Sequence, residues 1–193
     1  TSTGGGLSLG TALGTGVTFT GGAGVETISI GATTKAITMG GGNDAVTIGA
    51  SALGTGGSVD AGDGTADTMT MTIANANAAS ANGTFETTIS GVERLSISNS
   101  AASNSVDLAN LDDINYVTSA GSTGTLTISN ASTGFTLIQT AAATTGHTVT
   151  LADSSATTDA ITYKLTNASS TAGGTLTANS IETIAIESDD TAA

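Results

Sequence analysis

The chain is patterned by a short unit in which an acidic residue is followed by apolar residues at alternate positions. Side chains two apart in a strand share a face, so each acid should lie on the same side as the apolar residues that follow it. The pattern predicts many short β-strands with an inward acid at the mouth of each. The acidic copies begin at Glu26, Asp44, Asp67, Glu93, Asp112, Asp159 and Glu182.

The spacing of these units indicates how the strands are arranged. A related unit at Lys35 stands nine residues from both Glu26 and Asp44, and later steps are longer and irregular. A β-sandwich would also give many short strands, but it does not need the same residue at the mouth of each one. Stacked coils with variable turns do need it. We therefore expect an all-β, right-handed parallel β-solenoid whose seven acids form one column.

Helical periodicity is weak throughout the chain. Residues 74–81 are rich in Ala and Asn without apolar spacing of 3.6, which predicts a loop or one short turn. Leu108–Ile114 could form a short helical turn, but Ile114-Asn-Tyr116 continues the strand repeat and favours strand–turn–strand. No run of 18 apolar residues is present, so the sequence predicts no membrane-spanning helix and no membrane insertion.

Composition and charge narrow the expected partners. With 3 basic against 16 acidic residues, the net charge of −13 disfavours nucleic acid, whose phosphates require Lys and Arg. An acid that faces the core needs a partner, because an unpaired buried charge is very costly. Since basic residues are scarce, the sequence favours a bound cation. The chain has no Cys, no Trp and 3% aromatic residues, which suits a thin core of stacked small side chains.

Glycine-rich turns precede the first acids. Gly21-Gly22-Ala-Gly24-Val-Glu26 fits the nonapeptide G-G-x-G-x-D-x-apolar-x with Glu for Asp, and Met39-Gly40-Gly41-Gly42-Asn43-Asp44 fits it 18 residues later. A third version runs from Asp60 to Asp67. These turns resemble the RTX repeats of bacterial secreted proteins, which form a parallel β-roll that binds calcium. Later units such as Val92-Glu93-Arg-Leu-Ser-Ile97 resemble the calcium-binding regions of RTX-type bacterial surface-layer proteins of the Caulobacter type.

The resemblance implies a domain plan, a cofactor and a location. It implies an N-terminal coil or cap over 1–24, RTX-like calcium-binding coils over 21–73 and continuing solenoid coils over 74–193. Ca²⁺ is the implied cofactor, and the implied protein is secreted to the bacterial cell surface, where it assembles with itself and reaches surface polysaccharide through another domain. The implied calcium ligands are Gly22, Gly24, Glu26, Gly40, Gly42, Asn43, Asp44, Asp60, Gly62, Asp63 and Asp67.

Other residues point to structural roles. Asp112, Asp159 and Glu182 lack glycine turns and are expected to cap backbone N–H groups, and the lone His147 has no Ser or Cys partner for catalysis. No nucleophile elbow, phosphate loop or zinc signature is present, so we expect no enzyme. A calcium-dependent adhesin, an ice- or ligand-binding solenoid with Thr rows such as Thr68-Met-Thr-Met-Thr72, and a fibre subunit remain alternatives to a surface-layer segment.

Overall fold

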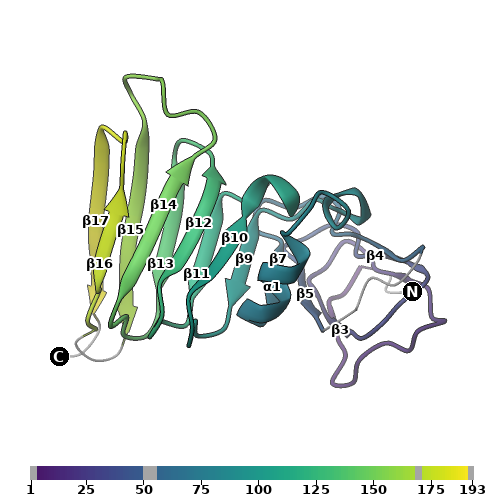
Figure 1. The fold of residues 1–193 in the computed structure, drawn as a ribbon. Helices are drawn as coiled ribbons and strands as arrows, with labels where there is room; N and C mark the ends of the chain where they lie inside the picture. Colours follow the sequence, from purple (N-terminus) through teal and green to yellow (C-terminus); the bar gives the residue numbers. More distant parts are fainter. Residues whose placement is uncertain (1–3, 50–55, 168–170, 191–193) are drawn as a thin grey trace.

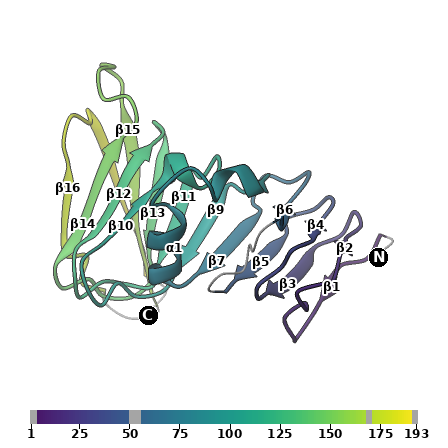
Figure 2. The same cartoon turned by 45° about the vertical axis from the view of Figure 1, so that its right-hand side comes forward.

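The chain forms a parallel β-solenoid of about eight turns in the computed structural model (Figures 1 and 2). The structure describes residues 4–49, 56–167 and 171–190. Residues 1–3 of the expected N-terminal coil, 50–55 of the expected RTX-like coils, and 168–170 and 191–193 of the expected continuing coils therefore lie outside the described part. Every strand pair within that part is parallel, which confirms the predicted β-solenoid.

One long sheet runs the length of the molecule. Its nine strands lie in chain order, each separated in sequence by a strand or connection on the opposite side. They are β1 Leu7–Ser8, β3 Glu26–Ile30, β5 Ala45–Ile48, β7 Thr68–Met71, β9 Arg94–Ile97, β11 Tyr116–Ser119, β13 Phe135–Gln139, β15 Ala160–Asn167 and β17 Thr183–Asp190.

Two shorter sheets share the opposite side of the core. The first has the order β2 Phe19–Thr20, β4 Ala36–Thr38, β6 Ser58–Asp60 and β8 Ile89–Ser90. The second has the order β10 Asn104–Asp107, β12 Leu126–Ala131, β14 Gly146–Leu151 and β16 Thr175–Ala178. The nine-residue step from Glu26 to Lys35 is thus half a coil, from β3 in the long sheet to the start of β4 in the first short sheet.

A helix marks the place where one short sheet gives way to the next (Figure 2). Helix α1 spans Ile73–Ala79 and is capped by Thr72, whose hydroxyl accepts the N–H of Asn75 at 3.2 Å. It buries only Ile73 and Ala76, so its apolar stripe was too short to stand out in the sequence. Two 3₁₀ helices, η1 Glu86–Thr88 and η2 Leu108–Asn110, lie in the same region, and η2 replaces the strand–turn–strand expected there.

The core is built from columns of inward side chains that stack from coil to coil. One column has the same register through seven strands and is almost fully buried in each of them. Burying one such side chain stabilises the fold by about 1.5–3 kcal/mol, so repetition of the unit compensates for a core only one layer thick. The column consists of Ile28, Val46, Met69, Leu95, Val117, Leu137 and Tyr163.

Within the described residues, no helix is long and apolar enough to cross a membrane.

Candidate functional site: a buried carboxylate ladder

Glycine turns stack on one another where the chain passes from the first short sheet to the long sheet. The Gly41 N–H donates to the Gly22 carbonyl at 2.7 Å, and the Asp63 N–H donates to the Gly40 carbonyl at 2.7 Å. The Gly42 N–H completes the stack by donating to the Asp63 carbonyl at 2.9 Å. Consecutive turns are therefore joined through their backbones at the mouth of the strands.

This close stacking is a reason for glycine that does not involve a metal. Gly40 and Gly62 have φ of +106° and +90°, a region that other residues rarely adopt. A Cβ added to Gly40 would lie 2.1 Å from the Gly22 carbonyl oxygen, and one added to Gly62 would lie 1.9 Å from that of Gly40. The glycines keep each turn in contact with the turn of the preceding coil.

Beneath the turns, acids of successive coils form a ladder of hydrogen bonds. The Asp44 carboxylate accepts the Glu26 backbone N–H at 2.7 Å across 18 residues. The Asp67 carboxylate accepts the Asp44 N–H at 2.5 Å across 23 residues, and that of Glu93 accepts the Asp67 N–H at 2.9 Å across 26 residues. We call Glu26, Asp44, Asp67 and Glu93 the carboxylate ladder. The unequal steps show that the connections absorb insertions while the acid keeps its place.

Each of the first three ladder acids is buried and has one oxygen without a partner. Glu26, Asp44 and Asp67 are at most 2% exposed. Glu26 Oε2, Asp44 Oδ2 and Asp67 Oδ2 have no hydrogen-bond partner among the described residues. The chain has only three Lys and Arg residues, and the ion pairs found in the described part both involve Lys164, far along the solenoid. The ladder thus concentrates negative charge without a basic side chain to balance it.

The environment acts on the protonation of these acids. Burial raises the pKa of Asp67 from 3.8 to about 6, the backbone hydrogen bond from Asp44 opposes this rise, and the neighbouring carboxylates of Glu93 and Asp44 add to it. Burial also raises the pKa of Asp44, against the hydrogen bond from Glu26. Both shifts favour neutralisation, which a proton or a cation can supply.

The turn presents a further oxygen beside the ladder at Gly64. A Cβ built on this glycine would lie 2.1 Å from Asp67 Oδ2 and 2.5 Å from the Gly42 carbonyl oxygen. A carboxylate oxygen and a carbonyl oxygen therefore face one small space that only glycine leaves open. Oxygens of these two kinds are the ligands of Ca²⁺, so the residues present fit a hard cation. The described residues contain no cluster of three acid or His side chains suited to a metal, so carbonyl oxygens would have to complete the coordination.

The predicted ligands occupy different places in this arrangement. Gly22, Gly24, Gly40, Gly42 and Gly62 contribute to the stacked turns, where the side-chain oxygen of Asn43 accepts the Thr65 N–H at 3.2 Å. Asp63 lies in a turn but its side chain is exposed. Asp60 is also exposed, on β6, where its carboxylate accepts the Ser90 hydroxyl at 3.2 Å and takes no part in the ladder.

Glu93 belongs to the ladder although the glycine motif did not place it among the predicted ligands. Its unit has a single preceding glycine, Gly91, with φ of +73°, in place of a full glycine motif. The acid–apolar unit shared by all four members was the signal that could have found it. The side chain is longer than aspartate, and its Oε2 still reaches the Asp67 N–H.

The expectation of a single column of seven acids is wrong. In the coil after Glu93, the strand register puts Asn115 at the ladder position, because η2 and the turn after it displace Asp112 from it. Asp159 and Glu182 form a separate pair two positions before the ladder position, which in their coils is held by Ile161 and Ile184. The capping role holds for two of them: Asp112 accepts the Val92 N–H at 2.7 Å and Glu182 accepts the Asp159 N–H at 3.0 Å.

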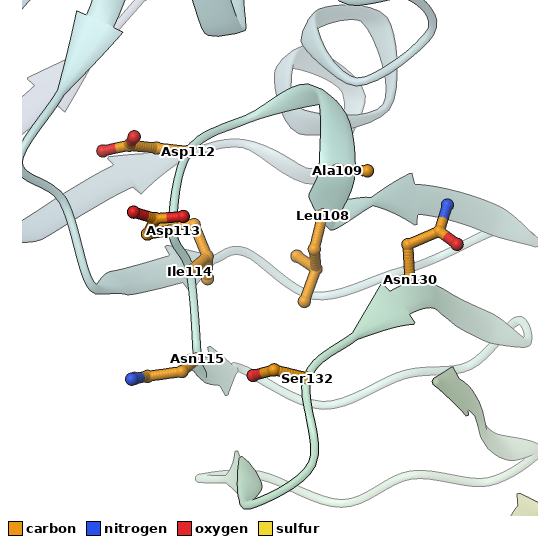
Figure 3. A pocket seen from close by; sticks show the side chains of 8 residues that line it. All are labelled: Leu108, Ala109, Asp112, Asp113, Ile114, Asn115, Asn130 and Ser132. Atoms are coloured by element: carbon orange, nitrogen blue, oxygen red, sulfur yellow. The ribbon is translucent and has the colours of Figure 1, made fainter. Parts of the chain in front are cut away.

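A pocket of about 360 Å³ lies beside η2, away from the carboxylate ladder, and is lined in part by Asp112, Asp113 and Asn130 (Figure 3). In this view the two aspartates lie on one side and the Asn130 amide on the other, pointing away from them. The Asp112 carboxylate accepts a hydrogen bond from the Val92 N–H, and the Asn130 amide donates one to the Asp107 carboxylate at 2.7 Å. The polar groups of this pocket do not converge on a common point.

His147 has the structural role expected of it. It is 1% exposed on β14, and its Nε2 lies 2.7 Å from Gln139 Oε1, so Nε2 carries the proton that is donated. The Tyr163 hydroxyl also contacts Gln139 Oε1, and the Gln139 amide donates to the Ala172 carbonyl at 2.7 Å. Burial lowers the pKa of His147 to about 4, which keeps it neutral near pH 7.

No protein-family model matches the chain, and no curated protein sequence matches it.

Proposed function

We propose that this chain is a structural segment of a calcium-dependent bacterial surface assembly of the surface-layer type, secreted and non-enzymatic. The observation that carries the proposal is the carboxylate ladder: buried acids stacked under glycine turns, each of the first three with an oxygen that lacks a partner among the described residues. A structural element for an extracellular lattice needs rigidity more than a reactive cleft, and a long stack of parallel coils supplies it.

Calcium would act on the ladder through charge. In this proposal, Glu26, Asp44 and Asp67 supply carboxylate oxygens, and turn carbonyls such as that of Gly42 complete the coordination. Binding a cation only in the folded state stabilises that state by mass action, because the unfolded chain does not hold these oxygens together. Assembly on the cell surface would then depend on calcium outside the cell. The parallel solenoid, the acidic composition and the glycine turns support this interpretation.

Far-ultraviolet circular dichroism in excess EGTA, then in millimolar CaCl₂ or MgCl₂, tests the calcium part of the proposal. We expect loose structure in chelator and a gain of β-signal with Ca²⁺ that Mg²⁺ does not reproduce, since Mg²⁺ releases its water reluctantly and demands octahedral geometry. A full β-signal in excess EGTA would contradict calcium-driven folding. Electron microscopy with and without Ca²⁺ separates sheets, filaments and monomers, and monomers in both conditions would contradict the assembly part.

A second candidate function rests on the outer face of the long sheet. Five outward hydroxyl residues succeed one another in register across five strands, and such a row would be spaced at about 4.8 Å. A regular row of hydroxyl groups of this kind is suited to ordering water, as in an ice-binding module. The row ends where Ile138 and Lys164 take the same position. Thermal hysteresis of the purified chain separates this function from the structural one. The row is Ser29, Thr47, Thr70, Ser96 and Thr118.

A further inference from the structure

The capping role expected of Asp159 is not found in the structure. Its Oδ2 is buried and has no hydrogen-bond partner among the described residues. The residue as a whole is 2% exposed, so its side chain has little contact with bulk water. A buried carboxylate oxygen without a partner is costly. This position therefore calls for a group that the donors of the described chain do not supply.

Asp159 stands at the mouth of a strand, on the side of the core. It immediately precedes β15 and comes two residues before the buried Ile161, so the two side chains share a face. In the preceding coil, the Thr133 hydroxyl accepts the Ala160 N–H at 3.1 Å. In the following coil, Glu182 Oε2 accepts the Asp159 N–H at 3.0 Å. Asp159 thus lies between two coils that both present side-chain oxygens to the start of β15.

Two further carboxylates lie close enough to act on Asp159. After burial, the charges of Glu182 and then of Asp153 raise the pKa of Asp159. Asp153 belongs to the connection between β14 and β15, which projects beyond the ends of the strands (Figure 1). Its Oδ1 accepts both the N–H and the hydroxyl of Ser155, at 2.9 and 2.7 Å. Since Glu182 uses only Oε2 for the Asp159 N–H, each neighbouring acid keeps a second oxygen for another partner.

No basic side chain of the described residues balances these charges. Lys164 is five residues further along β15 than Asp159, about 16 Å away, and it already pairs with two other acids. Arg94 and Lys35 belong to earlier coils, on β9 and beside β4. A proton would neutralise Asp159 alone, whereas a cation would neutralise it and also coordinate the free oxygen of Glu182.

We propose that Asp159 and Glu182 bind a hard divalent cation, Ca²⁺ or Mg²⁺, at the mouth of β15 and β17, with the charge of Asp153 nearby. The described acids form no three-carboxylate cluster, so water and carbonyl oxygens of the exposed connection 153–158 would complete the coordination. The site goes beyond the proposed function, which places calcium in the first coils. It has no glycine turn like theirs and does not depend on the carboxylate ladder.

Line broadening by Mn²⁺ locates such a site, because Mn²⁺ takes the same oxygen ligands and its unpaired electrons broaden the signals of nearby amides. Trace MnCl₂ is added to the full ¹⁵N-labelled chain at the lowest Ca²⁺ concentration, zero included, that gives the complete β-signal in circular dichroism. We expect the amide signals of Asp159, Glu182 and Thr183 to broaden. Added CaCl₂ or MgCl₂ should restore them, and the more effective of the two identifies the preferred ion.

Two variants remove one ligand each. Asp159→Asn and Glu182→Gln remove a charge and keep the size of the side chain, and the glutamine can still accept the Asp159 N–H. Each should weaken Mn²⁺ binding at this place at least about tenfold. Glu187→Gln is the matched control, because it makes the same change five residues further along the same coil, where the side chain lies 3.9 Å from Lys164. It should leave the broadening at Asp159 unchanged.

Two results would overturn the proposal. If the signals of Asp159 and Glu182 stay sharp while other amides of the wild type broaden, a proton and not a cation neutralises Asp159. If these signals broaden equally in the wild type and both variants, the ion lies elsewhere on the acidic surface. The amide signals of Asp44 and Asp67 report on the carboxylate ladder in the same spectra, so failure of this site and failure of the ladder as a calcium site are distinguishable.

Discussion

Asp67→Asn is the substitution that most sharply probes the carboxylate ladder. The remaining side-chain oxygen can still accept the Asp44 N–H, which lies 2.5 Å from the present carboxylate. The new amide group can take the place of Oδ2 and donate toward the Gly42 carbonyl, which shares the space beside Gly64 with it. The variant therefore removes the charge and preserves the shape and hydrogen bonds of the site.

The magnitude is set by the pKa of Asp67. A shift from 3.8 to about 6 corresponds to about 3 kcal/mol at full strength, and screening by water at the turn mouth reduces it to on the order of 1–2 kcal/mol. Because the folded pKa of Asp67 is raised, the folded state binds more protons than the unfolded state between these values. Its contribution to stability is therefore present at low pH and is lost as the pH rises through about 6.

Chemical denaturation in EGTA at pH 8 and pH 5 measures this effect, with sucrose added at one fixed concentration to keep the metal-free chain folded. We expect Asp67→Asn to exceed the wild type by on the order of 1–2 kcal/mol at pH 8. The advantage should fall by about half at pH 5, which lies between the unfolded pKa of 3.8 and the folded pKa of about 6. In saturating Ca²⁺ the order should reverse, since the variant loses a ligand. Asp60→Asn, the same change at an exposed acid outside the ladder, should stay within about 0.5 kcal/mol.

A destabilised Asp67→Asn in EGTA at pH 8 would refute the reasoning. So would a difference from the wild type that does not change between pH 8 and pH 5. Either result would mean that the charge of Asp67 is already compensated within the chain.

Two other substitutions test the turns and the buried histidine. Gly62→Ala should destabilise the fold by on the order of 2–4 kcal/mol in thermal or chemical unfolding. The reason is that the new Cβ would lie 1.9 Å from the Gly40 carbonyl oxygen and that φ at residue 62 is +90°. The control is Gly16→Ala, which has open space around it and should change stability by less than about 0.5 kcal/mol. His147 has a lowered pKa of about 4, so it costs stability as the pH falls from 6.5 toward 4. His147→Gln, which keeps an amide donor for Gln139, should abolish that loss in a pH series of unfolding midpoints, and an unchanged slope would exclude His147 as its source.

The sequence was sufficient for the strand pattern and for the solenoid. Alternation such as Glu26-Thr-Ile28-Ser-Ile30 defines the inward face directly, and equal spacing in the first coils defines stacking. Asp44 and Asp67 were found because acids at the mouths of stacked strands must fall on one another. In these first coils the spacing of the residues along the chain is therefore enough to predict which acids stack on one another.

The later coils could not be registered from the sequence. Asp112 precedes an apolar alternation like the other acids, yet η2 uses additional residues and moves it out of the ladder. Asp159 and Glu182 occupy equivalent positions in their two coils. Those positions lie two residues before the ladder position, which Ile161 and Ile184 hold. Register depends on how each connection is packed, and irregular connections leave no periodic signal.

Proton release on calcium binding tests the central claim most directly, because it asks whether the cation reaches the ladder. In the metal-free chain kept folded with sucrose, the Asp67 pKa of about 6 means that about half of these side chains hold a proton at pH 6, and a cation bound there must displace it. A pH-stat titration with CaCl₂ should therefore release at least about half a proton per chain at pH 6 and almost none at pH 8, and Asp67→Asn should release less. Calcium binding at pH 6 without proton release would place the ion on the acidic surface and contradict the account.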